Sequence, residues 1–172
     1  MKIVGFSGGR RISDLGTVDD VALFFACVKQ FVEGKYPDQD WHLLTDRLYK
    51  RYLRSEELHP AREKMVQVKQ VFTELPSSLI DWNNISDESR LNPELPILSD
   101  VFDDYFSTFL TCAASAEFMH ENVQPYPSGY LKVMITEIPY YAGEQKRPLE
   151  QYDALGADDL PFWIQQTGEF FI

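Results

Sequence analysis

The chain has 172 residues, 44% apolar and 14% aromatic, so it can bury a hydrophobic core and is not a disordered protein. Cys27 and Cys112 are too few for a disulfide scaffold, and their apolar surroundings predict buried free thiols in a reducing compartment. A net charge of −11 argues against nucleic acid or an anionic membrane as partner. No secretory signal opens the chain, and no apolar run approaches the roughly 18 residues that cross a bilayer, which predicts a cytoplasmic protein.

The negative charge is concentrated in the second half of the chain. Residues 1–75 carry 12 basic and 11 acidic residues, whereas residues 76–172 carry 4 and 16. No basic residue occurs between Arg90 and Lys132. A basic partner is the natural complement of such a surface, although a high net charge also serves solubility alone.

The first half of the chain predicts one strand followed by three helices. The apolar run Met1–Phe6 ends at Ser7-Gly8-Gly9, which is typical of a strand that enters a turn. Thr17 is a candidate N-cap of the first helix. Apolar residues then recur at helical spacing over residues 17–34, 41–52 and 55–75. In the third helix the expected buried stripe consists of Leu58, Met65, Val68 and Phe72.

The second half predicts a strand at residues 79–82, a polar loop to Pro96, a helix capped by Ser99 and a strand at residues 130–138. The apolar stripe of this last helix turns Asp100 and Asp104 towards solvent and leaves Asp103 beside them. That stripe comprises Phe102, Tyr105, Phe106, Phe109, Leu110 and Ala113. Because the helices cluster and do not alternate with strands, we expect an α+β fold. Residues 1–172 should form a single domain, with a small sheet of at least three strands packed against about four helices.

Two catalytic or ligand-binding interpretations concern the first turn. The pattern Gly5-Phe6-Ser7-Gly8-Gly9 matches the G-x-S-x-G nucleophile elbow of hydrolases, but no motif surrounds any of the candidate bases His42, His59 and His120. A structural role is therefore expected for Ser7. The same segment extended to Arg10-Arg11 resembles the first loop of Rossmann-like nucleotide-binding proteins, in which backbone N–H groups cradle phosphate.

Metal-ligand spacing is absent from the sequence. There is no C-x-x-C or H-x-x-x-H pattern, and acidic residues in the first turn of a helix, such as Asp100, Asp103 and Asp104, are explained by the helix dipole. We expect neither a metal nor a cofactor.

Several segments resemble a family of immunity proteins from bacterial polymorphic-toxin and contact-dependent growth inhibition systems. They are Trp41-His-Leu-Leu-Thr-Asp-Arg-Leu-Tyr49, Leu53-Arg-Ser-Glu-Glu-Leu58, Leu75-Pro-Ser-Ser-Leu-Ile-Asp-Trp82 and Tyr105-Phe106. The resemblance covers about residues 1–115 and leaves residues 116–172 without a counterpart. It implies a cytoplasmic protein without enzymatic activity that binds a cognate toxin domain tightly and stoichiometrically.

The charge distribution agrees with this resemblance. Toxin domains of such systems are frequently nucleases, whose substrate channels are basic, so an inhibitor should present carboxylates to them. The candidate toxin-binding residues are Asp87, Glu88, Asp100, Asp103 and Asp104. A Rossmann-like nucleotide-binding or hydrolytic domain that uses Gly5–Arg11 is the alternative, and a general acidic adaptor is a third possibility.

Overall fold

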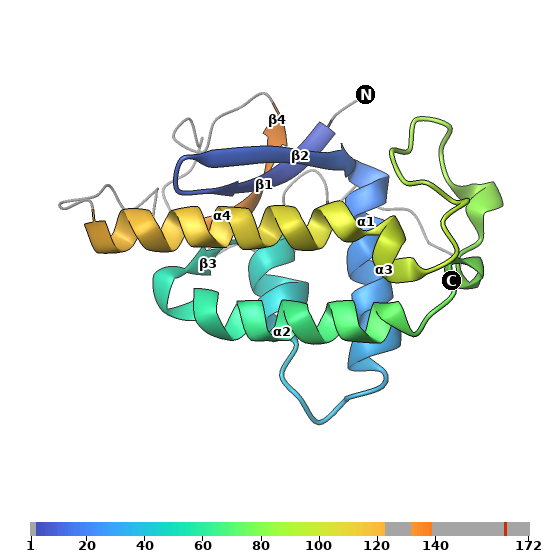
Figure 1. Cartoon of the computed structure of the whole chain (residues 1–172), viewed down its shortest axis with the longest axis horizontal. Helices are drawn as coiled ribbons and strands as arrows, with labels where there is room; N and C mark the ends of the chain where they lie inside the picture. The colour runs from blue at the N-terminus through green and yellow to red at the C-terminus, as the bar shows by residue number, and fades with distance from the viewer. Residues whose placement is uncertain (1–2, 123–131, 139–163, 165–172) are drawn as a thin grey trace.

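A small antiparallel sheet forms one side of the molecule, as seen in a computed structural model that describes residues 3–122, the backbone of residues 132–138, and residue 164. Its strands are β1 (Ile3–Gly8), β2 (Arg11–Thr17), β3 (Leu53–Arg54) and β4 (Lys132–Ile138), in the order β2-β1-β4-β3 (Figure 1). Gly9 turns the chain from β1 into β2 at a φ of 58°, a left-handed conformation that glycine adopts without steric cost.

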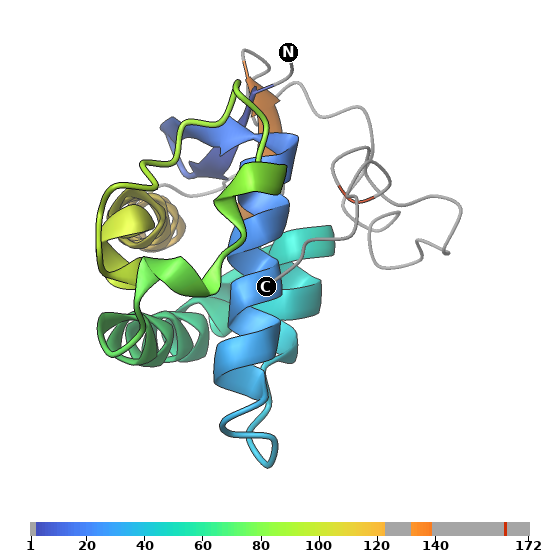
Figure 2. The same cartoon turned by 90° about the vertical axis from the view of Figure 1, so that its right-hand side faces the viewer.

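The helices stack below this sheet. They are α1 (Val18–Cys27), which continues as the π-helix η1 (Val28–Glu33), the π-helix η2 (Leu43–Leu48), α2 (Ser55–Thr73), the short α3 (Leu98–Val101) and α4 (Asp103–Asn122). In both views α4 lies between the sheet and α2, and α1 runs across them (Figures 1 and 2). The predicted α+β class is therefore confirmed. No helix in the described part of the chain is long and apolar enough to cross a bilayer.

An aromatic cluster joins the helices. The Phe24 ring stacks on the ring of Tyr105 at a centroid distance of 4.8 Å and meets the rings of Phe72, Phe102 and Phe106 within 6.0 Å. All of these side chains are buried, as the helical periodicity predicts.

Both cysteines are buried free thiols, as the sequence predicts. Burial raises the pKa of the Cys112 thiol to about 12. A thiol with so high a pKa is almost entirely protonated at neutral pH and is a poor nucleophile.

Two sequence predictions for strands need correction. The sequence indicates no strand at residues 11–17, where β2 occurs, because only the last three residues of β2 are buried and the segment shows no clear alternation. Residues 79–82 were expected to form a strand, but Leu79 ends the 3₁₀ turn η3 (Ser77–Leu79) and Trp82 begins the 3₁₀ turn η4 (Trp82–Asn84). The Trp82 indole donates a hydrogen bond to the Ser77 carbonyl at 2.9 Å, which folds this segment back on itself.

The helix expected from Ser99 is in fact two helices, and Ser99 does not cap the first, which begins at Leu98 with Ile97 as its N-cap. Phe102 adopts a non-helical φ of −106° and ψ of 20°, so α3 ends there and α4 begins at Asp103. Leu110 was expected in the buried stripe of this helix but is 41% exposed, because α2 and β1 cover other sides of α4.

Candidate functional site

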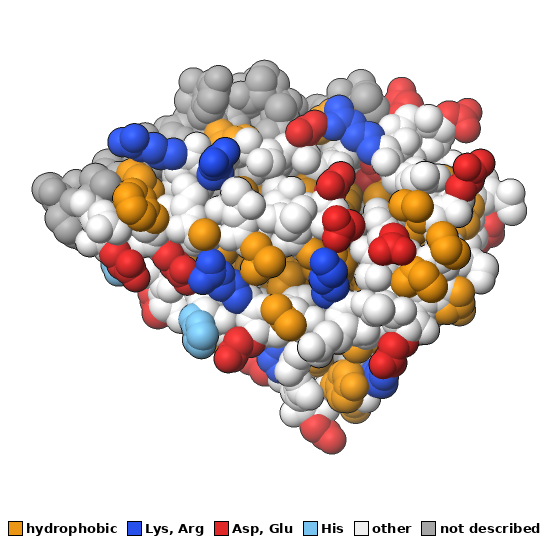
Figure 3. All heavy atoms as spheres, in the orientation of Figure 1, with side chains coloured by type: hydrophobic (Ala, Val, Ile, Leu, Met, Phe, Trp, Pro, Cys, Tyr) orange, Lys and Arg blue, Asp and Glu red, His pale blue; other side chains and the backbone are white. Residues whose placement is uncertain are grey.

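The predicted toxin-binding carboxylates lie on the surface at one end of the molecule. Asp100 is in α3, Asp104 is in the first turn of α4, and Asp87 and Glu88 are in the loop between η4 and α3. All four side chains are exposed, and none forms an ion pair with a side chain that the structure describes. Figure 3 shows acidic side chains gathered over the part of this face where α3 and the preceding loop lie in Figure 1.

Asp103, the fifth predicted residue, is turned towards α2. Its carboxylate accepts a hydrogen bond from the Lys69 ammonium at 3.1 Å. The Asp103 side chain is still 62% exposed, so this is a surface ion pair of small energetic weight. Asp103 is therefore partly neutralised, whereas its neighbour Asp104 is not.

The loop that carries Asp87 and Glu88 is fastened to the start of α1 by Asp20. The residue Asp20 is only 1% exposed. Its carboxylate accepts hydrogen bonds from the Arg90 backbone N–H at 2.9 Å and from the Ser89 hydroxyl at 2.5 Å. It also accepts the Thr17 backbone N–H at 3.1 Å, which completes a capping box with the Thr17 hydroxyl.

A second contact fixes the same loop to the sheet. The Arg90 guanidinium donates a hydrogen bond to the Asp14 carboxylate on β2. Arg90 is the single basic residue of the loop, and this ion pair directs it towards β2. Together with the Asp20 contacts, the pair holds the Asp87–Glu88 segment at a defined place on the surface.

The buried phenol of Tyr105, in α4, is influenced by the charges of both Asp20 and Asp104. Burial first, and then the negative charges of Asp20 and Asp104, raise the pKa of its phenol well above the ordinary value. We define the exposed carboxylates of the loop, of α3 and of the first turn of α4 as the acidic surface, which consists of Asp87, Glu88, Asp100 and Asp104.

Sequence reasoning missed the role of Asp20. Asp19 and Asp20 both look like ordinary first-turn acids, and a contact with residues 89 and 90 cannot be seen in the local sequence. The spacing Thr17-x-x-Asp20 was the available signal, because it matches the reciprocal pattern of a capping box. Burial and the charge of Asp20 raise the pKa of the Asp19 carboxyl, for which the described residues provide no such hydrogen-bonding network.

The glycine-rich turn lies against helix α4. A Cβ added to Gly8 would lie 2.4 Å from the Cys112 carbonyl oxygen, and one added to Gly9 would lie 2.5 Å from that of Ser115. The Arg10 backbone N–H donates to the Ser115 hydroxyl at 3.1 Å. The glycines therefore permit close packing between the hairpin and α4.

Ser7 is fully buried within β1, and its hydroxyl has no hydrogen-bond partner among the described residues. The candidate bases His42 and His59 are 61% and 80% exposed and lie beside Asp46 and Glu63. This geometry supports a structural role for Ser7. The nucleotide-binding alternative stays a prediction, which an increase in melting temperature on addition of nucleotide would support.

Ser7→Ala is expected to change the free energy of unfolding by less than about 1 kcal/mol, because no hydrogen bond within the described residues is lost. Gly8→Ala should instead lower it by about 1 to 3 kcal/mol through overpacking against Cys112. Denaturant titration of both variants measures the difference. A Ser7→Ala protein that folds normally but loses its biological activity would show that Ser7 is functional.

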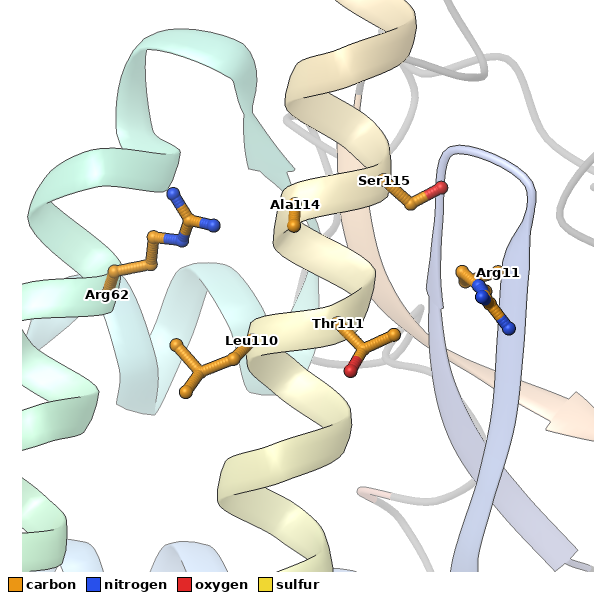
Figure 4. A pocket seen from close by; sticks show the side chains of 6 residues that line it. All are labelled: Arg11, Arg62, Leu110, Thr111, Ala114 and Ser115. Carbon is orange, nitrogen blue, oxygen red and sulfur yellow. The ribbon is translucent and has the colours of Figure 1, made fainter.

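A shallow hollow of about 680 Å³ runs along the outer side of α4. Arg62 of α2 lies on one side of the helix with Leu110 pointing towards it, and Arg11 of β2 lies on the other side near Thr111 and Ser115 (Figure 4). Within the part of the chain that the structure describes, no three His, Cys, Asp or Glu side chains come close enough together to hold a metal ion.

Comparison of the chain with protein-family models, with curated proteins and with solved structures gives no match.

Proposed function

We propose that this chain is an immunity protein without enzymatic activity, which neutralises a cognate toxin domain in the cytoplasm by binding it tightly in a one-to-one complex. The observation that supports this most directly is the acidic surface. Its four carboxylates are exposed and lack an ion pair with any described side chain, although Asp20 holds part of the surface in place. Unpaired charge on an anchored surface is available to a partner of opposite sign.

The class of partner follows from this charge and from the family resemblance seen in the sequence. A nuclease must bind phosphate with Lys and Arg side chains, so its substrate channel is basic. Carboxylates that enter such a channel compete with the nucleic acid and accelerate association. A nuclease domain is therefore the toxin that best complements this surface.

Co-expression tests the function itself. The toxin is the product of a toxin-like reading frame next to the gene for this chain, expressed under an inducible promoter. Cells that also express the chain should grow, whereas cells that express the toxin alone should stop growing. Growth arrest despite normal accumulation of the folded chain would contradict the proposal.

The acidic surface is tested by removing its charges, together with that of the neighbouring Asp103, in two groups. Asp100→Asn, Asp103→Asn and Asp104→Asn together, and separately Asp87→Asn with Glu88→Gln, should each lower the association rate with the toxin about tenfold at low salt. Each change should also reduce the salt dependence of that rate. Stopped-flow fluorescence at low and moderate salt measures both quantities.

The matched control for the Asp87 and Glu88 pair is Asp38→Asn with Glu56→Gln. It removes two exposed carboxylates from segments that lie outside the acidic surface. This control should leave the association rate nearly unchanged. Equal effects of the control and the test variants would mean that the net charge of the chain sets the association rate and that the acidic surface does not bind the toxin.

A further inference from the structure

The face formed by α2 and α4 exposes apolar side chains. Leu110 and Phe118 of α4 are 41% and 61% exposed, and Val66 of α2 is 49% exposed. Leu110, Ala114 and Phe118 follow one another at a spacing of four residues, which places them along one side of α4. Figure 3 shows apolar side chains in the middle of this face, between basic ones.

Two ion pairs define how the apolar residues are arranged. Arg62 pairs with Glu117 at 2.6 Å, and Lys69 pairs with Asp103 at 3.1 Å, so α2 and α4 run antiparallel. Val66 lies between the two cations in the sequence of α2, and Leu110 lies between the two acids in the sequence of α4. Both side chains therefore occupy the interval between the ion pairs. With Ala114 and Phe118 they form one strip, which we call the apolar strip.

Charge differs between the two ends of this face. Asp100 and Asp104 lie at the end where α4 begins, whereas Arg10 and Arg11 of the β1–β2 hairpin lie beside Ser115, further along α4. Both arginines are exposed and form no ion pair with a described side chain. A complementary partner must be apolar in the middle, basic at the Asp104 end and acidic opposite the hairpin.

We infer that the toxin docks along the α2–α4 face, with apolar side chains packed on the apolar strip and an acidic group opposite Arg10 and Arg11. This inference rests on the proposed function. Charge complementarity at the acidic surface accelerates encounter, but tight complexes also need a desolvated apolar or aromatic centre surrounded by polar residues. Phe118 is the aromatic side chain of the strip, so it is the expected anchor.

The test variant is Leu110→Ser with Phe118→Ser. Both side chains are exposed, so the fold should be retained, which circular dichroism and thermal melting check. Tyr36→Ser is the control, because Tyr36 is 38% exposed on the loop between η1 and η2. The probe is the purified, catalytically inactive product of the adjacent toxin-like reading frame, and surface plasmon resonance measures both rate constants.

The double variant should dissociate about 100-fold faster while its association rate and salt dependence stay unchanged, because apolar anchors act mainly on dissociation. Arg10→Ala with Arg11→Ala should weaken binding several-fold, and Tyr36→Ser should have no effect. If the wild type binds and the double variant dissociates at the same rate, the inference is wrong and the proposed function stands.

Two other outcomes also overturn the inference. If the wild type does not bind the toxin, the proposed function fails and the inference fails with it. If sedimentation shows that the wild type is a dimer and the double variant a monomer with unchanged toxin affinity, the apolar strip binds a second copy of the chain.

Discussion

Phe72→Ala is expected to lower the free energy of unfolding by about 3 to 5 kcal/mol, a large share of the stability of a single domain. Phe72 is completely buried, and its ring lies 6.0 Å from that of Phe24, 5.9 Å from that of Phe102 and 5.8 Å from that of Phe106. Truncation removes the ring contacts that connect α2 with α1, with the junction between α3 and α4, and with α4. The cavity cannot close easily, because rigid rings line it.

Denaturant titration measures this loss, and Phe118→Ala is its matched control. The control deletes the same ring from α4, where the side chain is 61% exposed, so the free energy of unfolding should change by no more than about 0.5 kcal/mol. A loss below about 1 kcal/mol for Phe72→Ala would mean that α2 presents a different side to the core.

Asp20→Ala should lower the free energy of unfolding by about 2 to 4 kcal/mol. The change removes the Asp20 half of the capping box of α1, the hydrogen bond from the Thr17 backbone N–H, which contributes about 0.5 to 1.5 kcal/mol. It also leaves the Arg90 backbone N–H and the Ser89 hydroxyl without their buried acceptor, which costs about 1 to 3 kcal/mol. Hydrogen exchange at the Arg90 amide should accelerate more than exchange in α2, because the loop is released first.

Asp19→Ala is the control for Asp20. It removes the same charge from the same helical turn but no hydrogen bond to the loop, so stability should change by less than about 1 kcal/mol. Unchanged protection of the Arg90 amide in Asp20→Ala would contradict the role of Asp20 as the anchor of the loop. If the anchor does organise the acidic surface, Asp20→Ala should also slow association with the toxin.

The buried faces of the helices could be predicted because helical periodicity reports directly on burial. Leu58, Met65, Val68 and Phe72 are all buried, and Thr17 caps α1 as expected. Strands were harder to predict, because β2 depends on pairing with β1 and on glycines that allow the hairpin to approach α4. The turns around Ile80 also depend on a side chain, since the Trp82 indole closes them.

The candidate surface could be predicted only in part. Asp100 and Asp104 are exposed as predicted. Helical geometry explains this for Asp104, which shares α4 with the apolar stripe, whereas Asp100 lies in the separate helix α3. Three features depend on contacts between distant segments and could not be predicted from the local sequence. They are the pairing of Asp103 with Lys69, the anchoring by Asp20, and the exposure of Leu110 beside α2. The local sequence of a helix does not determine which other element of the fold packs against it.

Isothermal titration calorimetry of the chain against the purified product of the adjacent toxin-like reading frame measures whether the chain binds a toxin and in what ratio. We expect one-to-one binding with a Kd in the nanomolar range or tighter, roughly −12 kcal/mol or below, that weakens as salt is added. Toxin activity should fall in proportion to added chain and vanish at an equimolar ratio. Full toxin activity and no binding heat in the presence of excess folded chain would show that the chain does not neutralise this toxin by binding it.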